Sequence, residues 1–111
     1  MPDSDPLRDL IRSTLEFYAR FGVQMQVGDA VRNFQEEVAE LIEAAQAGED
    51  KDHIAEEAAD VMVTAIGVCE AAGIDPERLI AQIYAVIAKN NAKTHETHVV
   101  ANGKIRRRQP K

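Results

Sequence analysis

Apolar residues recur at helical spacing in four stretches of this 111-residue chain, separated by short polar or glycine-containing segments. At about 100° per residue, the apolar positions of each stretch fall on one side of a helix. We therefore predict helices over residues 7–21, 29–47, 53–72 and 76–93, with a tail over residues 94–111. Asp29 is a suitable N-cap for the second helix, and Pro76 suits the first turn of the fourth. We expect residues 1–6 to be frayed.

The third predicted helix is apolar on nearly all sides after Asp60. A helix of this kind must be buried on more than one side, and Val63 and Ile66 face away from its main apolar stripe. A bundle of this size cannot easily cover them, so we expect a homodimer or a homotetramer. The linker GEDKD (residues 48–52) is short, which predicts that the second and third helices are antiparallel neighbours.

Acidic residues occupy matched positions on these two helices. The predicted apolar stripes consist of Phe34, Val38, Leu41 and Ala45 on one helix, and of Ile54, Ala58, Val61, Ala65 and Val68 on the other. Glu37 and Glu40 lie at the edge of the first stripe, and Glu57 and Asp60 lie at the edge of the second. If the stripes pack together, four carboxylates converge, and their repulsion requires protons or hard cations. Oxygen ligands suit Mg²⁺, Mn²⁺ or Ca²⁺.

The alternative is that these acids form an ordinary solvated helix face. Charge runs such as Glu36 to Glu40 usually do so. Asp60 favours a functional site instead, because an aspartate is unfavourable inside an apolar helix and is rarely buried without a partner.

Charge is distributed unevenly. Residues 1–88 carry a net charge of −12, and residues 89–111 carry +6. An acidic body with a basic tail can bind a metal and a polyphosphate together, and it argues against a nucleic-acid partner. The tail alone is equally consistent with a solubilising, disordered end.

The length suggests one domain over residues 1–111. Without a membrane-spanning run, a signal peptide or a second cysteine beside Cys69, we expect no membrane partner and a cytoplasmic location.

Three other groups of residues are candidates for a binding site, a metal site or a turn. Phe17, Tyr18 and Phe21 would either line a base or sugar pocket or belong to the core, and the core is the more common role of such aromatics. His95 and His98 lack the spacing of a zinc motif. Asn102–Gly103 is a turn signal that predicts a small β-hairpin.

The segment EEVAE (residues 36–40), followed by EEAAD (residues 56–60) and VMVTA, resembles the motif of the MazG-like all-α nucleoside triphosphate pyrophosphohydrolases. EFYARFG, GID and a late N-x-x-K are similar to the short members grouped with phosphoribosyl-ATP pyrophosphohydrolase-like proteins. The resemblance extends from the first helix to Lys93. It implies an all-α fold, an antiparallel four-helix bundle of the MazG-like type with a short basic C-terminal tail.

The same resemblance implies Mg²⁺-dependent hydrolysis, with Mn²⁺ as an alternative ion, of a nucleoside triphosphate or deoxynucleoside triphosphate to the monophosphate and pyrophosphate. Such an activity would serve the nucleotide pool. The residues that match the metal positions are Glu37, Glu40, Glu57 and Asp60. Glu36 would orient or deprotonate the attacking water, and Asn90 and Lys93 would bind phosphate or sugar. Phosphoribosyl-ATP is the alternative substrate, and a non-catalytic metal-binding helical interaction module is the alternative function.

Overall fold

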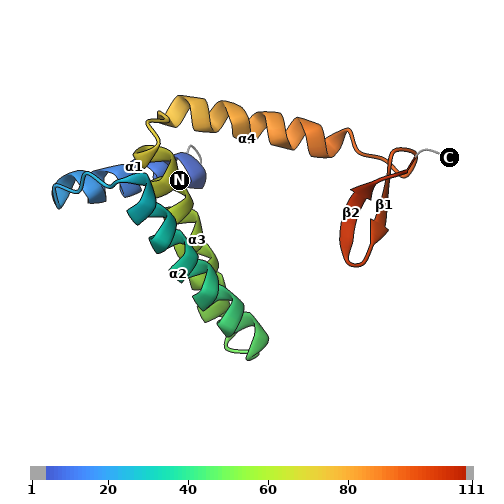
Figure 1. The fold of residues 1–111 in the computed structure, drawn as a ribbon, viewed down its shortest axis with the longest axis horizontal. Helices are drawn as coiled ribbons and strands as arrows, with labels where there is room; N and C mark the ends of the chain where they lie inside the picture. Colours follow the sequence, from blue (N-terminus) through green and yellow to red (C-terminus); the bar gives the residue numbers. More distant parts are fainter. Residues whose placement is uncertain (1–4, 110–111) are drawn as a thin grey trace. The chain divides into compact units, whose positions relative to one another are not determined.

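The computed structural model describes residues 5–109. In that range the helices and strands are α1 (Pro6–Arg20), α2 (Val27–Gln46), α3 (Lys51–Ala71), α4 (Pro76–Asn91), β1 (His98–Ala101) and β2 (Lys104–Arg107) (Figure 1). The predicted all-α class with four helices is confirmed. The chain divides into two compact units, Met1–Pro76 and Glu77–Lys111.

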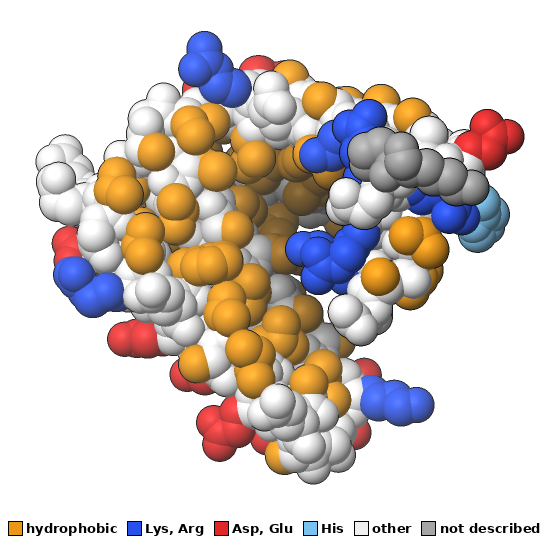
Figure 2. All heavy atoms as spheres, turned by 45° about the vertical axis from the view of Figure 1, so that its right-hand side comes forward, with side chains coloured by type: hydrophobic (Ala, Val, Ile, Leu, Met, Phe, Trp, Pro, Cys, Tyr) orange, Lys and Arg blue, Asp and Glu red, His pale blue; other side chains and the backbone are white. Residues whose placement is uncertain are grey.

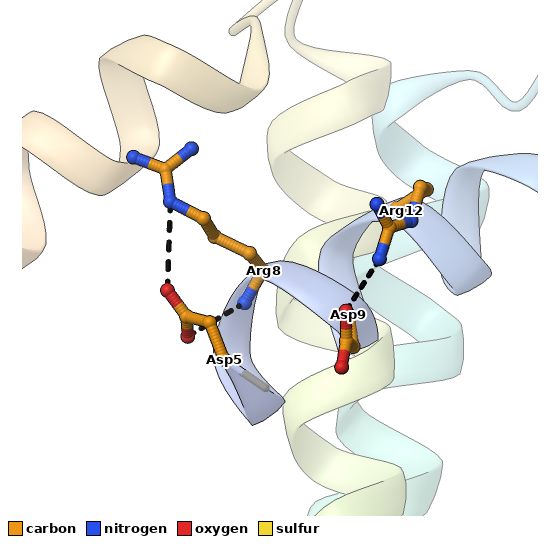
Figure 3. Close-up of polar contacts among 4 residues, drawn as sticks. All are labelled: Asp5, Arg8, Asp9 and Arg12. Carbon is orange, nitrogen blue, oxygen red and sulfur yellow. Dashed lines mark hydrogen bonds and ion pairs between the residues drawn. The ribbon is translucent and has the colours of Figure 1, made fainter. Parts of the chain in front are cut away.

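Helix α1 begins with a well-formed N-terminal cap. The Asp5 carboxylate accepts a hydrogen bond from the backbone N–H of Arg8 at 3.2 Å (Figure 3). Pro6 occupies the first turn. One turn on, Asp9 pairs with Arg12. The prediction that residues 1–6 are frayed is therefore wrong for Asp5 and Pro6, and residues 1–4 lie outside the described residues.

Helix α2 begins two residues before its predicted start. Gln26 is its N-cap and makes no side-chain capping hydrogen bond, so the prediction that Asp29 caps this helix is wrong. Asp29 lies instead in the first turn, where its charge interacts favourably with the helix N-terminus, and it pairs with Arg32. At the start of α3, Asp50 accepts a hydrogen bond from the backbone N–H of Asp52 at 3.1 Å.

Helices α2 and α3 run antiparallel and pack side by side, as Figure 1 shows. The stripe residues that are half-buried are Phe34, Val38 and Leu41 on α2, and Ile54, Ala58, Val61 and Val68 on α3. Toward one end of each helix the burial differs from the prediction. Ala44 and Ile66 are buried, whereas Ala45 and Ala65 are exposed.

Ile66 is buried in the region where α1 packs against α3. The Tyr18 side chain of α1 lies directly against Gly67, the next residue on α3, where an added Cβ would be 2.6 Å from the Tyr18 hydroxyl oxygen. The absence of a side chain at Gly67 therefore permits this approach. The prediction that Ile66 belongs to a face left open in the single chain is wrong, because the contact between α1 and α3 is made in this region.

The buried apolar core is small. Its members among the described residues are Ile11, Ala30, Ala44, Ile66 and Ile80. Apolar side chains also cover much of the surface visible in Figure 2, and the large ones that are most exposed include Phe21, Met62, Tyr84, Val100 and Ile105. Between Asp5 and Gln109, no helix combines the length and the apolarity needed to cross a membrane.

The C-terminal unit contains most of α4 and the β-hairpin. Strands β1 and β2 are antiparallel, with His98 opposite Arg107 and Val100 opposite Ile105. The hairpin turn predicted at Asn102–Gly103 is present, and both residues have positive φ angles, 53° and 74°, as a two-residue turn of this type requires.

Candidate functional site

Three glutamates from two helices converge in the N-terminal unit. Glu37 and Glu40 lie on successive turns of α2, and Glu57 lies on α3. Each offers a carboxylate oxygen, and these oxygens all lie within 4.8 Å of one another. The antiparallel packing of α2 on α3 produces this convergence, because each helix places its acids at the edge of the packed stripe.

Two of these carboxylates are withdrawn from solvent. The side chain of Glu57 is only 12% exposed, and Glu37 is half-buried. One oxygen of each, Oε2, is fully buried, and neither has a hydrogen-bond partner within the described part of the chain. Buried oxygens of ionised carboxylates are unfavourable without a partner. The site therefore requires a proton or a cation at this position.

The electrostatics of the site lead to the same conclusion. Burial is the largest cause that raises the pKa of Glu37. The charge of Glu40 and a hydrogen bond with Glu40 raise this pKa further, and the charges of Asp60 and Glu57 make smaller contributions in the same direction. Burial also raises the pKa of Glu57, with a further increase from the charge of Glu40, while His53 lowers it. In the metal-free protein, the protonated forms are thus favoured relative to a solvated glutamate.

Asp60 and Glu36 lie outside the group of three. Asp60 is half-buried on α3, and its charge contributes to the raised pKa of both Glu37 and Glu57. Glu36 is exposed on α2. It lies one turn before Glu40 on the same helix, at i, i+4 spacing. The structure thus brings together three of the four residues expected to bind metal.

Asn90 and Lys93 lie at the end of α4 and just beyond it, in the C-terminal unit. The Lys93 ammonium donates a hydrogen bond to the Asn90 side-chain oxygen at 3.0 Å. The i, i+3 spacing of the N-x-x-K motif places the two groups on neighbouring turns. They form one polar pair that can present an ammonium and an amide to the same ligand.

His53 was not identified from the sequence as a candidate. Its Nε2 atom lies 3.5 Å from Glu57 and 3.4 Å from Glu49, and its Nδ1 atom lies 3.5 Å from Glu56. The i, i+4 spacing from His53 to Glu57 is the signal that would have revealed it. When protonated, His53 would offset part of the negative charge at the edge of the site.

The three glutamates fit a hard divalent cation. They provide only oxygen atoms, which Mg²⁺ and Mn²⁺ accept and which zinc favours less than nitrogen and sulfur. The unpartnered buried oxygens of Glu37 and Glu57 supply acceptors that a cation would satisfy. A cation would also remove the repulsion that raises their pKa values.

Comparisons with known proteins extend these observations. The model of the phosphoribosyl-ATP pyrophosphohydrolase family matches residues 14–86. The solved structure of a MazG-like pyrophosphohydrolase from cyanophage S-2L, bound to dGDP and three catalytic Mn²⁺ ions per active site, matches all of both chains with a TM-score of 0.68 and 21% identity. No curated protein matches the chain. This chain therefore shares the fold of the MazG-like pyrophosphohydrolase, belongs to the phosphoribosyl-ATP pyrophosphohydrolase family, and is a hydrolase that acts on phosphoric anhydrides.

Proposed function

We propose that this protein hydrolyses a nucleoside or deoxynucleoside triphosphate to the monophosphate and pyrophosphate, using Mg²⁺ or, as an alternative, Mn²⁺. The observation that carries the proposal is the cluster of Glu37, Glu40 and Glu57, in which a buried oxygen of Glu37 and one of Glu57 have no hydrogen-bond partner in the described part of the chain. The phage protein of the same fold, which binds dGDP and Mn²⁺, supports both the substrate class and the ion class.

In this proposal Glu37, Glu40, Glu57 and Asp60 hold the divalent cations. When bound, the cations neutralise phosphate charge and make water a better nucleophile. Bound cations would favour the ionised carboxylates, because they would offset the burial and the mutual repulsion that raise the pKa values of Glu37 and Glu57. Asp60 lies near enough to influence the pKa of Glu37 and Glu57, so it completes the ligand set from the α3 side.

Glu36 and the polar pair of Asn90 and Lys93 have the remaining roles in this proposal. Glu36 is exposed and so is free to accept a proton from the attacking water or to orient it. Attack at the α-phosphorus breaks the anhydride bond to the β-phosphate and releases pyrophosphate. Lys93 and Asn90 contact phosphate or sugar oxygens, since an ammonium forms strong charge-assisted hydrogen bonds to phosphate.

We also propose that the active form is a homodimer or a homotetramer. The small buried core and the many exposed large apolar side chains support this proposal, because monomers rarely expose so much apolar surface. We further propose that residues 1–111 form a single catalytic domain.

A substrate panel tests the proposed function. Ribo- and deoxyribonucleoside triphosphates and phosphoribosyl-ATP are each incubated with the protein and Mg²⁺, and pyrophosphate is resolved from orthophosphate. Pyrophosphate release from at least one triphosphate is the expected result. Because the matching family model describes phosphoribosyl-ATP pyrophosphohydrolases, preferential cleavage of phosphoribosyl-ATP would support the alternative substrate. Metal binding without hydrolysis of any compound would support a non-catalytic module.

A further inference from the structure

The C-terminal unit contains a pocket of about 450 Å³ at the junction of α4 and the hairpin. Its lining combines apolar strand residues with polar residues from the end of α4 and the following turn: Val99, Val100 and Ile105, with Asn90, Lys93, Thr94, His95 and His98. Small-molecule sites commonly have volumes of about 300–1,000 Å³ and mainly apolar walls with a few convergent polar groups. The size and lining of this pocket match that description.

The apolar wall belongs mainly to one face of the hairpin. Val100 and Ile105 are directly opposite each other, and alternation along the strands places His98 on the same face. Val100 is 69% exposed and Ile105 is 60% exposed. A ligand with a flat apolar surface would remove this apolar area from water, which is favourable.

Hydrogen bonds hold the pocket walls in place. The hydroxyl oxygen of Thr97 lies 2.7 Å from Nδ1 of His98, which fixes the orientation of the imidazole ring. Arg108, just after β2, donates from its side chain to the carbonyl of His95 at 2.6 Å, and from its backbone N–H to the carbonyl of Thr97 at 2.9 Å. The turn and the hairpin are thus tied together, so a ligand meets a pocket that is already formed.

The polar side of the pocket suits an anion. The Lys93 ammonium, which is paired with the Asn90 amide oxygen at 3.0 Å, contributes to the lining. Residues 77–111 contain eight basic and two acidic side chains, so this unit carries a net charge of +6. Its field attracts negatively charged ligands. An amide such as Asn90 can donate a hydrogen bond to a phosphate oxygen or accept one from a sugar hydroxyl beside Lys93.

We propose that this pocket binds the nucleoside 5′-phosphate part of the nucleotide, with the base against Val100, Ile105 and the His98 ring and the phosphate at Lys93. The nature of the ligand rests on the proposed function. An inorganic phosphate would use Lys93 but leave the apolar wall in water. A purely apolar ligand would leave the ammonium unused. A nucleotide matches both parts of the lining.

Binding of nucleotides in metal-free buffer tests this proposal. Each of the four ribonucleoside 5′-monophosphates is added to the ¹⁵N-labelled full chain in EDTA, and the amide chemical shifts are followed. We expect the largest changes at residues 98–100 and 105 with at least one nucleotide, and changes confined to the surroundings of Lys93 with inorganic phosphate. Unchanged shifts at residues 98–105, or changes centred on Phe17 and Phe21 instead, would overturn the assignment.

Kinetics separate this proposal from the proposed function. Val100→Ser should raise KM for the best triphosphate roughly tenfold, since loss of an apolar pocket contact of this size has that order of effect, while kcat changes much less. Lys104→Ser is the matched control, because Lys104 lies on the opposite face of the same hairpin. An unchanged KM in Val100→Ser would contradict the pocket. If the wild type cleaves no triphosphate but the monophosphate shifts persist, the proposed function fails and the pocket stands.

Discussion

At the scale of single residues, Glu57 has the environment in which a lost charge should matter most. Its side chain is 12% exposed, and one of its oxygens is buried with no hydrogen-bond partner among residues 5–109. Glu57→Gln should weaken divalent-cation binding severely and abolish turnover, because a neutral amide is a poor ligand for Mg²⁺. Without metal, the variant should be at least as stable as the wild type, since repulsion falls. Calorimetric Mg²⁺ titration and thermal unfolding in EDTA measure both effects.

Glu56→Gln provides the matched control for this variant. Glu56 is the neighbouring residue on α3, and its side chain is 70% exposed. The substitution removes the same charge from a position outside the cluster, so metal binding and turnover should stay near the wild-type values. Equal losses in Glu56→Gln and Glu57→Gln would show that overall charge, rather than the cluster, controls metal binding.

The raised pKa values of Glu37 and Glu57 predict how the stability of the metal-free protein depends on pH. A carboxyl whose pKa is higher in the folded than in the unfolded chain binds its proton more tightly when folded. The free energy of unfolding should therefore fall as the pH rises from the ordinary glutamate pKa of 4.5 through the raised folded-state value. Urea unfolding in EDTA across this range measures the slope.

Glu37→Gln should reduce that slope, whereas Glu43→Gln, at an exposed position of α2, should leave it nearly unchanged. A metal-free protein whose stability rises with pH in this window would contradict the raised pKa values. Added Mg²⁺ should reverse the trend, because the metal binds the ionised carboxylates and stabilises the folded state.

At the scale of secondary structure, α1 approaches α3 closely where Tyr18 lies against Gly67. Gly67→Ala should gain up to about 1 kcal/mol of helix propensity, but the added methyl group would lie 2.6 Å from the Tyr18 hydroxyl. Such overpacking costs about 1–3 kcal/mol, so the free energy of unfolding should fall by roughly 1 kcal/mol. Urea unfolding of the variant measures it.

Tyr18→Phe removes the hydroxyl that makes this contact. In the Tyr18→Phe background, Gly67→Ala should therefore be close to neutral or stabilising, and a double-mutant cycle isolates the difference. If Gly67→Ala were equally stabilising in both backgrounds, α1 would not pack on α3 through this pair.

The helices and the pairing of α2 with α3 could be predicted from the sequence because these features depend on local periodicity and a short linker. Phe34, Val38 and Leu41 are half-buried as the stripe predicted. The burial of Ile66 could not be predicted, because this residue lies where α3 meets α1, which is far from it in sequence. The start of α2 was misplaced because Asp29 suits an N-cap and a first turn equally well.

For the site, the matched spacing of the acids was sufficient to place Glu37, Glu40 and Glu57 together. The pocket of the C-terminal unit was not predicted, although the Asn102–Gly103 turn indicated the hairpin. Its lining depends on the contacts of Arg108 with the turn containing His95 and Thr97, and no periodicity in the sequence encodes these contacts.

At the scale of the whole molecule, the exposed apolar surface predicts self-association. Phe21, Met62 and Tyr84 are all more than half exposed. Burial of such side chains between copies would be favourable. Sedimentation velocity at micromolar concentration should show a dimer or a tetramer, and a net charge of −6 should not prevent association at physiological salt. A monomer across this concentration range would mean that the apolar surface serves another purpose.

The central claim is that the three-glutamate cluster supports metal-dependent pyrophosphohydrolysis. Phosphorus NMR of the products formed from the best triphosphate tests it most directly, with the wild type in Mg²⁺, the wild type in EDTA, and Glu57→Gln in Mg²⁺. We predict equal amounts of nucleoside monophosphate and pyrophosphate in the first sample, and unchanged triphosphate in the other two. Nucleoside diphosphate with orthophosphate in the first sample, or undiminished turnover in either of the others, would contradict the claim.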